Sequence, residues 1–207
     1  MRISITGSEL STRKHPYLSP PSPAWGVAFV FVAVLLAFAW LGCRSHDNLE
    51  ASWRPPHPSD RWTCIVVHHS GSDIGGAKRF DQWHRERGWD ELGYHFVIGN
   101  GSDTLDGQIE IGPRWLKQKH GAHCKTPDGY YNQHGIGICL VGNFDNYDPT
   151  PAQMSSLIRL CRYLCGQYHI PPSHILTHGG ITGETDCPGK RFDVEVVRRA
   201  IRGPGPL

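Results

Sequence analysis

The sequence predicts an α/β domain with a central, mixed β-sheet. Three short apolar runs, at residues 64–67, 136–141 and 175–177, are typical of buried strands. Stretches with apolar side chains at helical spacing begin near Ala77 and Thr150. Because strands and helices interleave along the chain, we expect one sheet flanked by helices in a single domain.

The predicted domain opens with the strand at residues 64–67, and His68 follows directly at its end. After a glycine-bounded loop, residues 77–87 have the apolar spacing of a helix. Polar and apolar residues alternate over residues 94–98, as they do in a half-buried strand. The Asn100-Gly101 pair then indicates a turn, so residues 107–112 are the predicted partner strand.

The clearest helix begins at Thr150. Thr150 and Gln153 form a capping box, and Pro151 occupies the first helical position. An apolar stripe follows at helical spacing: Met154, Leu157, Ile158, Cys161, Leu164, Cys165 and Tyr168.

Two elements complete the predicted domain. A short strand at residues 175–177 delivers His178 at its end, in the same way that the first strand delivers His68. Residues 192–201 close the domain as a helix capped by Asp193. Since sites in open α/β sheets favour strand ends, both histidines are candidates for a functional site.

An apolar segment at residues 24–43 stands apart from the predicted domain. It holds no charged residue, and about 20 apolar residues suffice to span a bilayer as a helix. Arg13 and Lys14 precede it, so the positive-inside rule places residues 1–23 in the cytoplasm and the rest of the chain outside. An uncleaved membrane anchor is the favoured interpretation, and a lipoprotein-type signal ending at residues 41–43 is the alternative. We therefore expect the domain to act in the cell envelope, exported beyond the cytoplasmic membrane.

Two further segments flank the predicted domain, which spans residues 61–202. Residues 44–60 combine prolines with polar residues and are interpreted as a semi-rigid linker, or alternatively as a loop packed on the domain. Residues 203–207 form a Gly/Pro tail for which no regular structure is expected. The net charge is +2 without any block of like charges, so nucleic acid is not an expected partner.

Two histidines and one cysteine form the most informative combination in the chain. His68 and His178 follow predicted strands, and Cys187 lies in a turn rich in proline and glycine. Two imidazoles and one thiolate are a common zinc ligand set that leaves one coordination position open. An open position on zinc favours water activation and hydrolysis. Tyr94 and Thr185 are candidates to stabilise a developing oxyanion.

Other interpretations of these residues stay open at the level of spacing alone. A single histidine at a strand end is usually a satisfied or surface side chain, and His69 and His95 are interpreted in that way or as donors to metal ligands. The chain has no Cys-x-x-Cys, His-Glu-x-x-His or Gly-x-Ser-x-Gly motif. Four cysteines lie in apolar runs and are interpreted as packing residues: Cys64, Cys139, Cys161 and Cys165.

Several separate stretches, in order, resemble the zinc-dependent N-acetylmuramoyl-L-alanine amidases of the amidase-2 family, which includes the peptidoglycan recognition proteins. The resemblance covers nearly all of the predicted domain. The matching stretches are residues 65–70, 93–98, 121–123, 132, 136–144, 150–154 and 185–189. The chain departs from the family pattern at Gly179-Gly180, at His134-Gly135 and in an insertion at residues 124–131. These departures bear on the stem-peptide preference and not on the metal site.

The resemblance implies a peptidoglycan recognition protein-like fold and a Zn²⁺ cofactor. It implies three zinc ligands, His68, His178 and Cys187. It implies that Tyr94 is the catalytic tyrosine, that Thr185 assists catalysis, and that two residues line the substrate groove, His123 and Asn132. The expected substrate is peptidoglycan or its muropeptide fragments, cleaved between N-acetylmuramic acid and L-alanine.

Three functions compete at this stage. The leading hypothesis is a membrane-tethered peptidoglycan amidase. A non-catalytic peptidoglycan-binding receptor is the alternative. Some members of the family that only bind peptidoglycan have lost the zinc cysteine, and the presence of Cys187 in this chain argues against that function. A third hypothesis is a metal-independent cysteine hydrolase with Cys187 as nucleophile and His178 as base.

Overall fold

The computed structural model describes residues 50–203, so the predicted anchor at residues 24–43 lies outside the described residues. One five-stranded sheet has the order β3-β2-β4-β1-β5. Its strands are β1 (Cys64–His69), β2 (Phe96–Ile98), β3 (Ile109–Ile111), β4 (Gly135–Leu140) and β5 (Ile175–Thr177). Strand β3 is antiparallel to β2 and the other pairs are parallel, which confirms the predicted mixed sheet.

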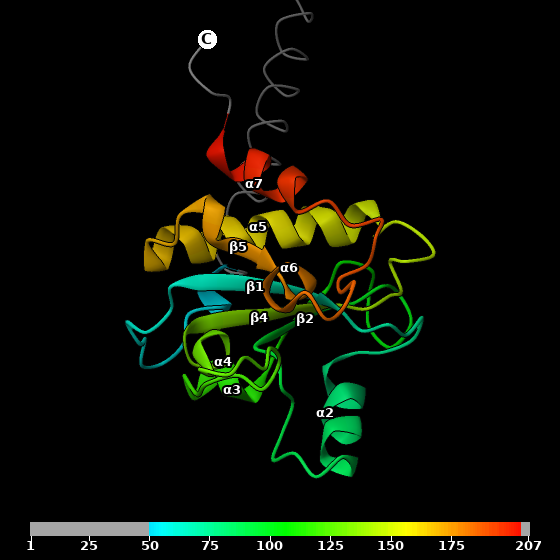
Figure 1. Cartoon of the computed structure of the whole chain (residues 1–207), viewed down its shortest axis with the longest axis horizontal. Coiled ribbons are helices and arrows are strands. Elements are labelled where there is room, and N and C mark those ends of the chain that lie inside the picture. Colours follow the sequence, from blue (N-terminus) through cyan, green and yellow to red (C-terminus); the bar gives the residue numbers. More distant parts are fainter. Residues whose placement is uncertain (1–49, 204–207) are drawn as a thin grey trace, which may run out of the picture. The chain divides into compact units, whose positions relative to one another are not determined.

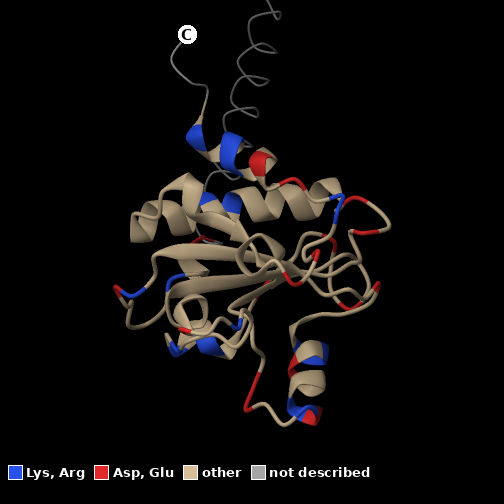
Figure 2. Cartoon of the chain, in the orientation of Figure 1, with Lys and Arg blue, Asp and Glu red and all other residues tan. Residues whose placement is uncertain are grey.

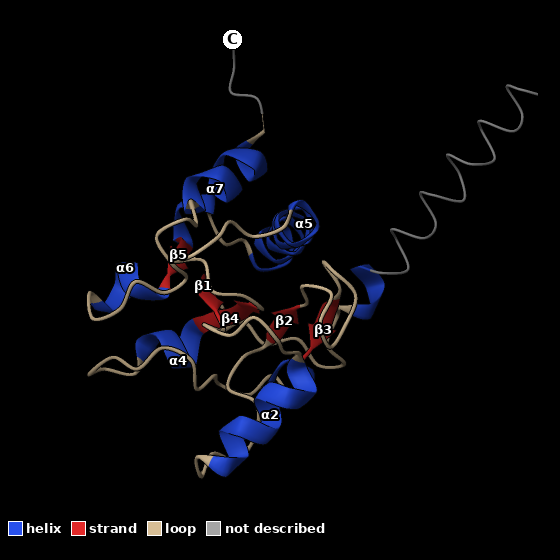
Figure 3. Cartoon of the chain, turned by 90° about the vertical axis from the view of Figure 1, so that its right-hand side faces the viewer, coloured by secondary structure: helices blue, strands red, loops and turns tan. Residues whose placement is uncertain are grey.

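Helices cover both faces of this sheet (Figures 1 and 3). Helices α5 and α7 lie on one face, and α2 and α4 lie on the other. The α-helices are α2 (Ala77–Glu86), α3 (Pro113–Leu116), α4 (Tyr130–His134), α5 (Pro151–Tyr168), α6 (His178–Thr182) and α7 (Val194–Arg202). A 3₁₀ turn, η1 (Pro172–His174), follows α5. Acidic and basic residues are interspersed on α2 and α7 (Figure 2).

Side chains on successive residues of a strand point to opposite faces of the sheet. The face beneath α5 and α7, here called the packing face, is formed by apolar side chains that share one buried cluster with those helices. Its strand residues are Ile65, Val67, Phe96, Ile98, Ile136, Ile138, Leu140 and Ile175. The opposite face, here called the site face, carries Cys64, Val66, His68, Gly135, Gly137 and Cys139.

The ends of α5 and α7 follow the predicted capping. The Thr150 side chain accepts a hydrogen bond from Gln153 N, and the Gln153 side chain accepts one from Thr150 N. Together these bonds satisfy two of the donors that a helix N-terminus leaves free. Asp193 caps α7 by accepting from Glu195 N. The predicted stripe of α5 is buried or packed against the core.

Two strand boundaries differ from the prediction. Strand β1 continues to His69, so His68 lies within the strand instead of after it. Strand β2 begins at Phe96, and at Gly93, two residues before His95, the chain has a different partner: Ala122 N donates to Gly93 O at 3.0 Å. Tyr94 therefore lies on the loop that enters β2.

The segment before β1 reaches the core. Trp53 is 1% exposed, and its carbonyl accepts a hydrogen bond from Trp115 Nε1 at 2.7 Å. Trp53 thereby packs residues of the 44–60 segment against the domain. Within residues 50–203, no helix combines the length and the apolar character that a membrane crossing requires.

Candidate active site

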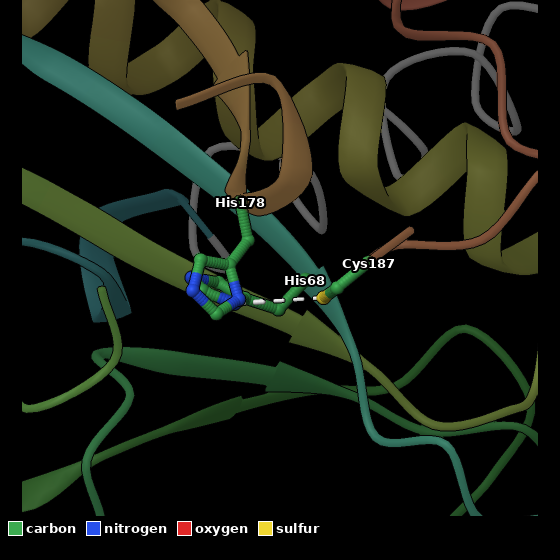
Figure 4. Close-up of side chains that lie close together, drawn as sticks. All are labelled: His68, His178 and Cys187. Carbon is green, nitrogen blue, oxygen red and sulfur yellow. Dashed lines mark hydrogen bonds between the residues drawn. The ribbon is translucent and has the colours of Figure 1, made fainter. Parts of the chain in front are cut away.

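Three side chains from separate segments converge at one end of the sheet (Figure 4). Strands β1 and β5 are parallel neighbours, with Val67 opposite Thr177, so the residues that follow this pair, His68 and His178, emerge side by side. Cys187 approaches from the loop after α6. The ligand atoms of the three residues all lie within 4.8 Å of one another. Sequence reasoning therefore identified three residues that the fold brings together.

Gly179 allows the segment that carries His178 to approach the loop that carries Cys187. Gly179 N donates to Cys187 O at 2.7 Å, and a Cβ on Gly179 would lie 2.1 Å from Thr185 O. Only a residue without a side chain allows this approach of the two backbones. The departure from the family pattern at Gly179 thus has a structural reason. Thr185 Oγ1 accepts from Cys187 N at 3.2 Å, which closes the turn before the ligand.

The donor set suits a metal that prefers nitrogen and sulfur. Burial, and then the neighbouring histidines, hold the pKa of His68 well below its ordinary value, and burial also lowers the pKa of His178. Both imidazoles are therefore neutral and can offer a lone pair. Burial raises the pKa of the Cys187 thiol to about 11, so a metal would have to displace its proton on binding. Two neutral imidazoles and one thiolate match zinc.

The same geometry disfavours a cysteine nucleophile. A reactive cysteine needs an electropositive environment that lowers its pKa, whereas burial raises the pKa of Cys187. Its sulfur lies 3.8 Å from Nδ1 of His68, which is not the histidine that the cysteine-hydrolase hypothesis assigns as base.

Tyr94 lies beside the cluster and keeps its proton. Its ring centroid is 5.2 Å from that of His68. Burial, together with the nearby thiols of Cys139 and Cys187, raises the pKa of Tyr94 well above its ordinary value. The hydroxyl is therefore a hydrogen-bond donor and not a base at neutral pH.

The loop before Tyr94 is fixed from beneath by two side chains that sequence reasoning did not single out. His84 Nδ1 accepts from Gly93 N at 3.0 Å. The guanidinium of Arg114, 1% exposed, donates to Leu92 O at 2.7 Å and to His120 O at 2.8 Å. These bonds anchor the loop that enters β2 and carries Tyr94. Arg114 also pairs with the carboxylate of Asp90. No sequence motif marks either residue, because the bonds that fix this loop go to backbone atoms and the Arg114–Asp90 pair joins residues 24 positions apart.

The two predicted groove residues have different environments. Asn132 Oδ1 accepts from both His123 N at 2.8 Å and Cys124 N at 2.9 Å, so it fixes the loop that carries His123. His123 is 8% exposed and places its Nδ1 3.1 Å from Nε2 of His68. Its own Nε2 lies 3.1 Å from Gly135 O. Spacing gave no sign of this contact between His123 and a candidate ligand.

His69 and His95, interpreted from the sequence either as satisfied side chains or as donors to metal ligands, hydrogen-bond to backbone atoms. His95 Nδ1 accepts from Gly137 N, and its Nε2 donates to Lys119 O. His69 Nδ1 accepts from Phe144 N. Among the described residues, neither ring hydrogen-bonds a candidate ligand, so the interpretation as satisfied side chains holds and the one as donors to the metal ligands does not.

A groove of about 440 Å³ opens beside the cluster. Its walls include Trp89, His123, Lys125, Asn132, His178 and Thr185. The Trp89 ring, 40% exposed, packs on His84 with ring centroids 4.5 Å apart. The sequence did not reveal Trp89, since an exposed aromatic residue in a loop follows no periodic pattern.

Comparisons with known proteins agree on one family. The amidase-2 family, described as N-acetylmuramoyl-L-alanine amidase, matches residues 58–190. An endolysin of Enterobacteria phage T3 is 41% identical over 113 residues, covering 51% of this chain and 68% of that protein. The N-acetylmuramoyl-L-alanine amidase LysC from Clostridium intestinale is 33% identical with a TM-score of 0.57, over 70% of this chain and 90% of that one. Peptidoglycan recognition protein LB of Drosophila, 24% identical with a TM-score of 0.51 over 70% of this chain and 89% of that one, shares the fold.

Proposed function

This chain belongs to the amidase-2 family of N-acetylmuramoyl-L-alanine amidases, and we propose that it is a zinc enzyme that cleaves peptidoglycan between N-acetylmuramic acid and L-alanine. The observation that carries the proposal is the convergence of His68, His178 and Cys187 beside an open groove and a protonated tyrosine. A receptor that only binds peptidoglycan has no need of such a donor set.

The zinc ligands would be His68, His178 and Cys187, and Zn²⁺ would be held with one position open toward substrate and water. When bound, the ion supplies a Lewis acid that polarises the scissile carbonyl and lowers the pKa of water to roughly 7. The protein prepares for this by keeping both imidazoles neutral through burial.

The phenol of Tyr94 donates a hydrogen bond to the oxyanion that develops when the amide carbonyl is attacked. Its raised pKa keeps the proton on the hydroxyl throughout the neutral range. Thr185 adds a second donor: its oxygen already accepts from Cys187 N, and its hydroxyl hydrogen remains available to the groove. Fixed donors of this kind are worth more than water because they need no reorganisation during the reaction.

The groove binds the muramoyl peptide, with His123 and Asn132 in its wall. Because Asn132 Oδ1 is occupied by two backbone amides, the group it offers to substrate is its amide NH₂. The partners are therefore peptidoglycan or soluble muropeptides. The apolar segment at residues 24–43 supports an exported, membrane-anchored domain in the cell envelope.

Digestion of purified peptidoglycan by the full-length protein tests this proposal, with products identified by mass spectrometry. We expect free stem peptides that begin with L-alanine, lost with a strong chelator and restored by Zn²⁺. Binding to peptidoglycan without release of peptides would replace the proposal with the receptor function. Cleavage that resists the chelator would instead indicate a metal-independent mechanism.

A further inference from the structure

The geometry points to His123 as the positioning residue of the metal site: it fixes His68 in the tautomer that presents Nδ1 to the metal. This inference rests on the proposed zinc site, and it assigns to His123 a role beyond lining the groove. It follows from three hydrogen-bonding partners in a row, Gly135 O, His123 and His68.

The row has one consistent arrangement of protons. A backbone carbonyl can only accept, so His123 Nε2, 3.1 Å from Gly135 O, carries the hydrogen. A neutral imidazole has a single N–H, which leaves a lone pair on His123 Nδ1. His68 Nε2, 3.1 Å away, therefore donates to it. The remaining lone pair of His68 is then on Nδ1, the atom that faces Cys187 Sγ at 3.8 Å.

The opposite arrangement would disable the site. If His123 carried its hydrogen on Nδ1, it would donate to His68 Nε2, which would then need a lone pair. The single N–H of the neutral His68 ring would therefore be on Nδ1, the atom that is to bind the metal. His123 Nε2 and Gly135 O would then face each other as two acceptors. By accepting the hydrogen of His123 Nε2, the carbonyl of Gly135 thus excludes the His68 tautomer that carries its hydrogen on Nδ1. Metal-bound histidines usually donate their second N–H to a carboxylate, carbonyl or water, and here an imidazole serves as the acceptor.

Two glycines provide the space for this ring. A Cβ on Gly137 would lie 2.4 Å from Cδ2 of His123, and a Cβ on Gly121 would lie 2.3 Å from the same atom. Gly137 is in the middle of the buried strand β4, where glycine weakens a strand and usually marks a close approach. Because the ring is held at both nitrogens, it could not move aside without losing a hydrogen bond. The sequence of β4 therefore reserves a slot for His123.

Tautomers can be measured directly in the metal-free, full-length protein with ¹⁵N-labelled histidine. Long-range ¹H–¹⁵N correlation spectra distinguish the two neutral tautomers of each ring. We expect both His68 and His123 to carry hydrogen on Nε2. A His68 ring with its hydrogen on Nδ1 would overturn the inference.

Zinc affinity gives the second readout, measured by competition with a chromophoric chelator. His123→Leu removes both hydrogen bonds and should weaken zinc binding by roughly 10–100-fold. His123→Gln keeps an acceptor and a donor on the side chain and should recover part of that loss. Gly137→Ala should also weaken binding, because it displaces the ring and leaves every ligand in place. Gly166→Ala is the matched control, since no atom lies within 4 Å of that added Cβ, and it should leave the affinity unchanged.

An unchanged zinc affinity in a folded His123→Leu protein would contradict the inference, as would equal losses for the Leu and Gln variants. If His123→Leu does not fold, the tautomer spectra and Gly137→Ala still decide the matter. None of these measurements contains peptidoglycan, so failure of the proposed amidase activity would leave their outcome intact.

Discussion

On the packing face, β1 contributes Ile65 and Val67 to a broad apolar cluster beneath α5 and α7, whereas on the site face the same strand contributes His68 to a chain of directed hydrogen bonds. Apolar contacts are non-directional, and a neighbour of similar volume can replace another at small cost. On the site face each ring nitrogen of His68 and His123 has one hydrogen-bonding partner. The space around the His123 ring is provided by two glycines, Gly121 and Gly137. Substitutions on the two faces should therefore have different signatures: lost stability on one, and lost metal affinity or activity on the other.

The largest expected effect comes from removing a ligand. Cys187→Ala should abolish stoichiometric zinc and reduce the amidase rate about 10³-fold or more, because the Lewis acid supplies several kcal/mol of transition-state stabilisation. Zinc content by atomic absorption and the rate of stem-peptide release provide the measurement. Near-normal activity in this variant would remove the zinc mechanism.

Tyr94→Phe should separate catalysis from metal binding. It removes one oxyanion donor and should lower the rate by about 10²–10³-fold while leaving the zinc affinity unchanged. Steady-state rates on a muropeptide and zinc titration of the same preparation provide the test. A Phe variant as active as the wild type would exclude Tyr94 from the reaction.

Stability should fall as the pH falls, because buried histidines resist protonation. Burial lowers the pKa of His95 to about 3 and that of His123 to about 4. From the ordinary histidine value of about 6.5 down to these values, the unfolded chain binds protons that the folded chain does not. The free energy of unfolding should therefore drop through this window by several kcal/mol, because each unit between the folded and unfolded pKa corresponds to about 1.4 kcal/mol and the pKa of both rings lies more than one unit below the ordinary value. Urea unfolding of the chelated protein at a series of pH values measures it, and a flat profile would contradict it.

Gly179→Ala should lower both the stability of the protein and its affinity for zinc. The added Cβ meets Thr185 O at 2.1 Å, and because that atom belongs to the backbone, the loop must move. We expect a loss of about 1–3 kcal/mol in stability, typical of overpacking, together with weaker zinc binding. Gly166→Ala, with open space around its Cβ, should instead stabilise α5 by about 0.5–1 kcal/mol. Equal effects of the two changes on urea midpoint and zinc affinity would refute the role given to Gly179.

The smallest effect is expected on the packing face. Ile65→Val removes one buried methylene from a cluster with no polar partner at that position and should cost about 0.5–1.5 kcal/mol. Zinc affinity should not change. A drop in affinity as large as that of Gly137→Ala would mean that the two faces are not independent.

Much of the packing face could be predicted because its signals are local. Helix α5 has a capping box and a periodic stripe, and both come from residues close together in sequence. The three candidate ligands could be proposed from His68 and His178 at strand ends and from the turn that holds Cys187, and the family resemblance joined them. The register that places Val67 opposite Thr177 explains why they meet.

The rest of the site depends on contacts between distant residues that carry no sequence pattern. His123 was predicted to line the groove, but its bond to His68 spans 55 positions and requires knowing how the loop folds over β4. The backbone acceptors of Arg114 carry no side-chain signal either. Nothing in the sequence around Gly137 distinguishes it from another strand residue. The structure explains why it is glycine, because the His123 ring fills the space that a side chain would need.

Stepwise addition of Zn²⁺ to metal-free, full-length protein, with muropeptide hydrolysis followed at each step, tests the central claim most directly. The account predicts that activity rises in proportion to added zinc and saturates at one ion per chain, with a free L-alanine amino group as the new product end. Hydrolysis that is complete before zinc is added, or zinc binding that brings no hydrolysis of the muramoyl–alanine bond, would contradict it.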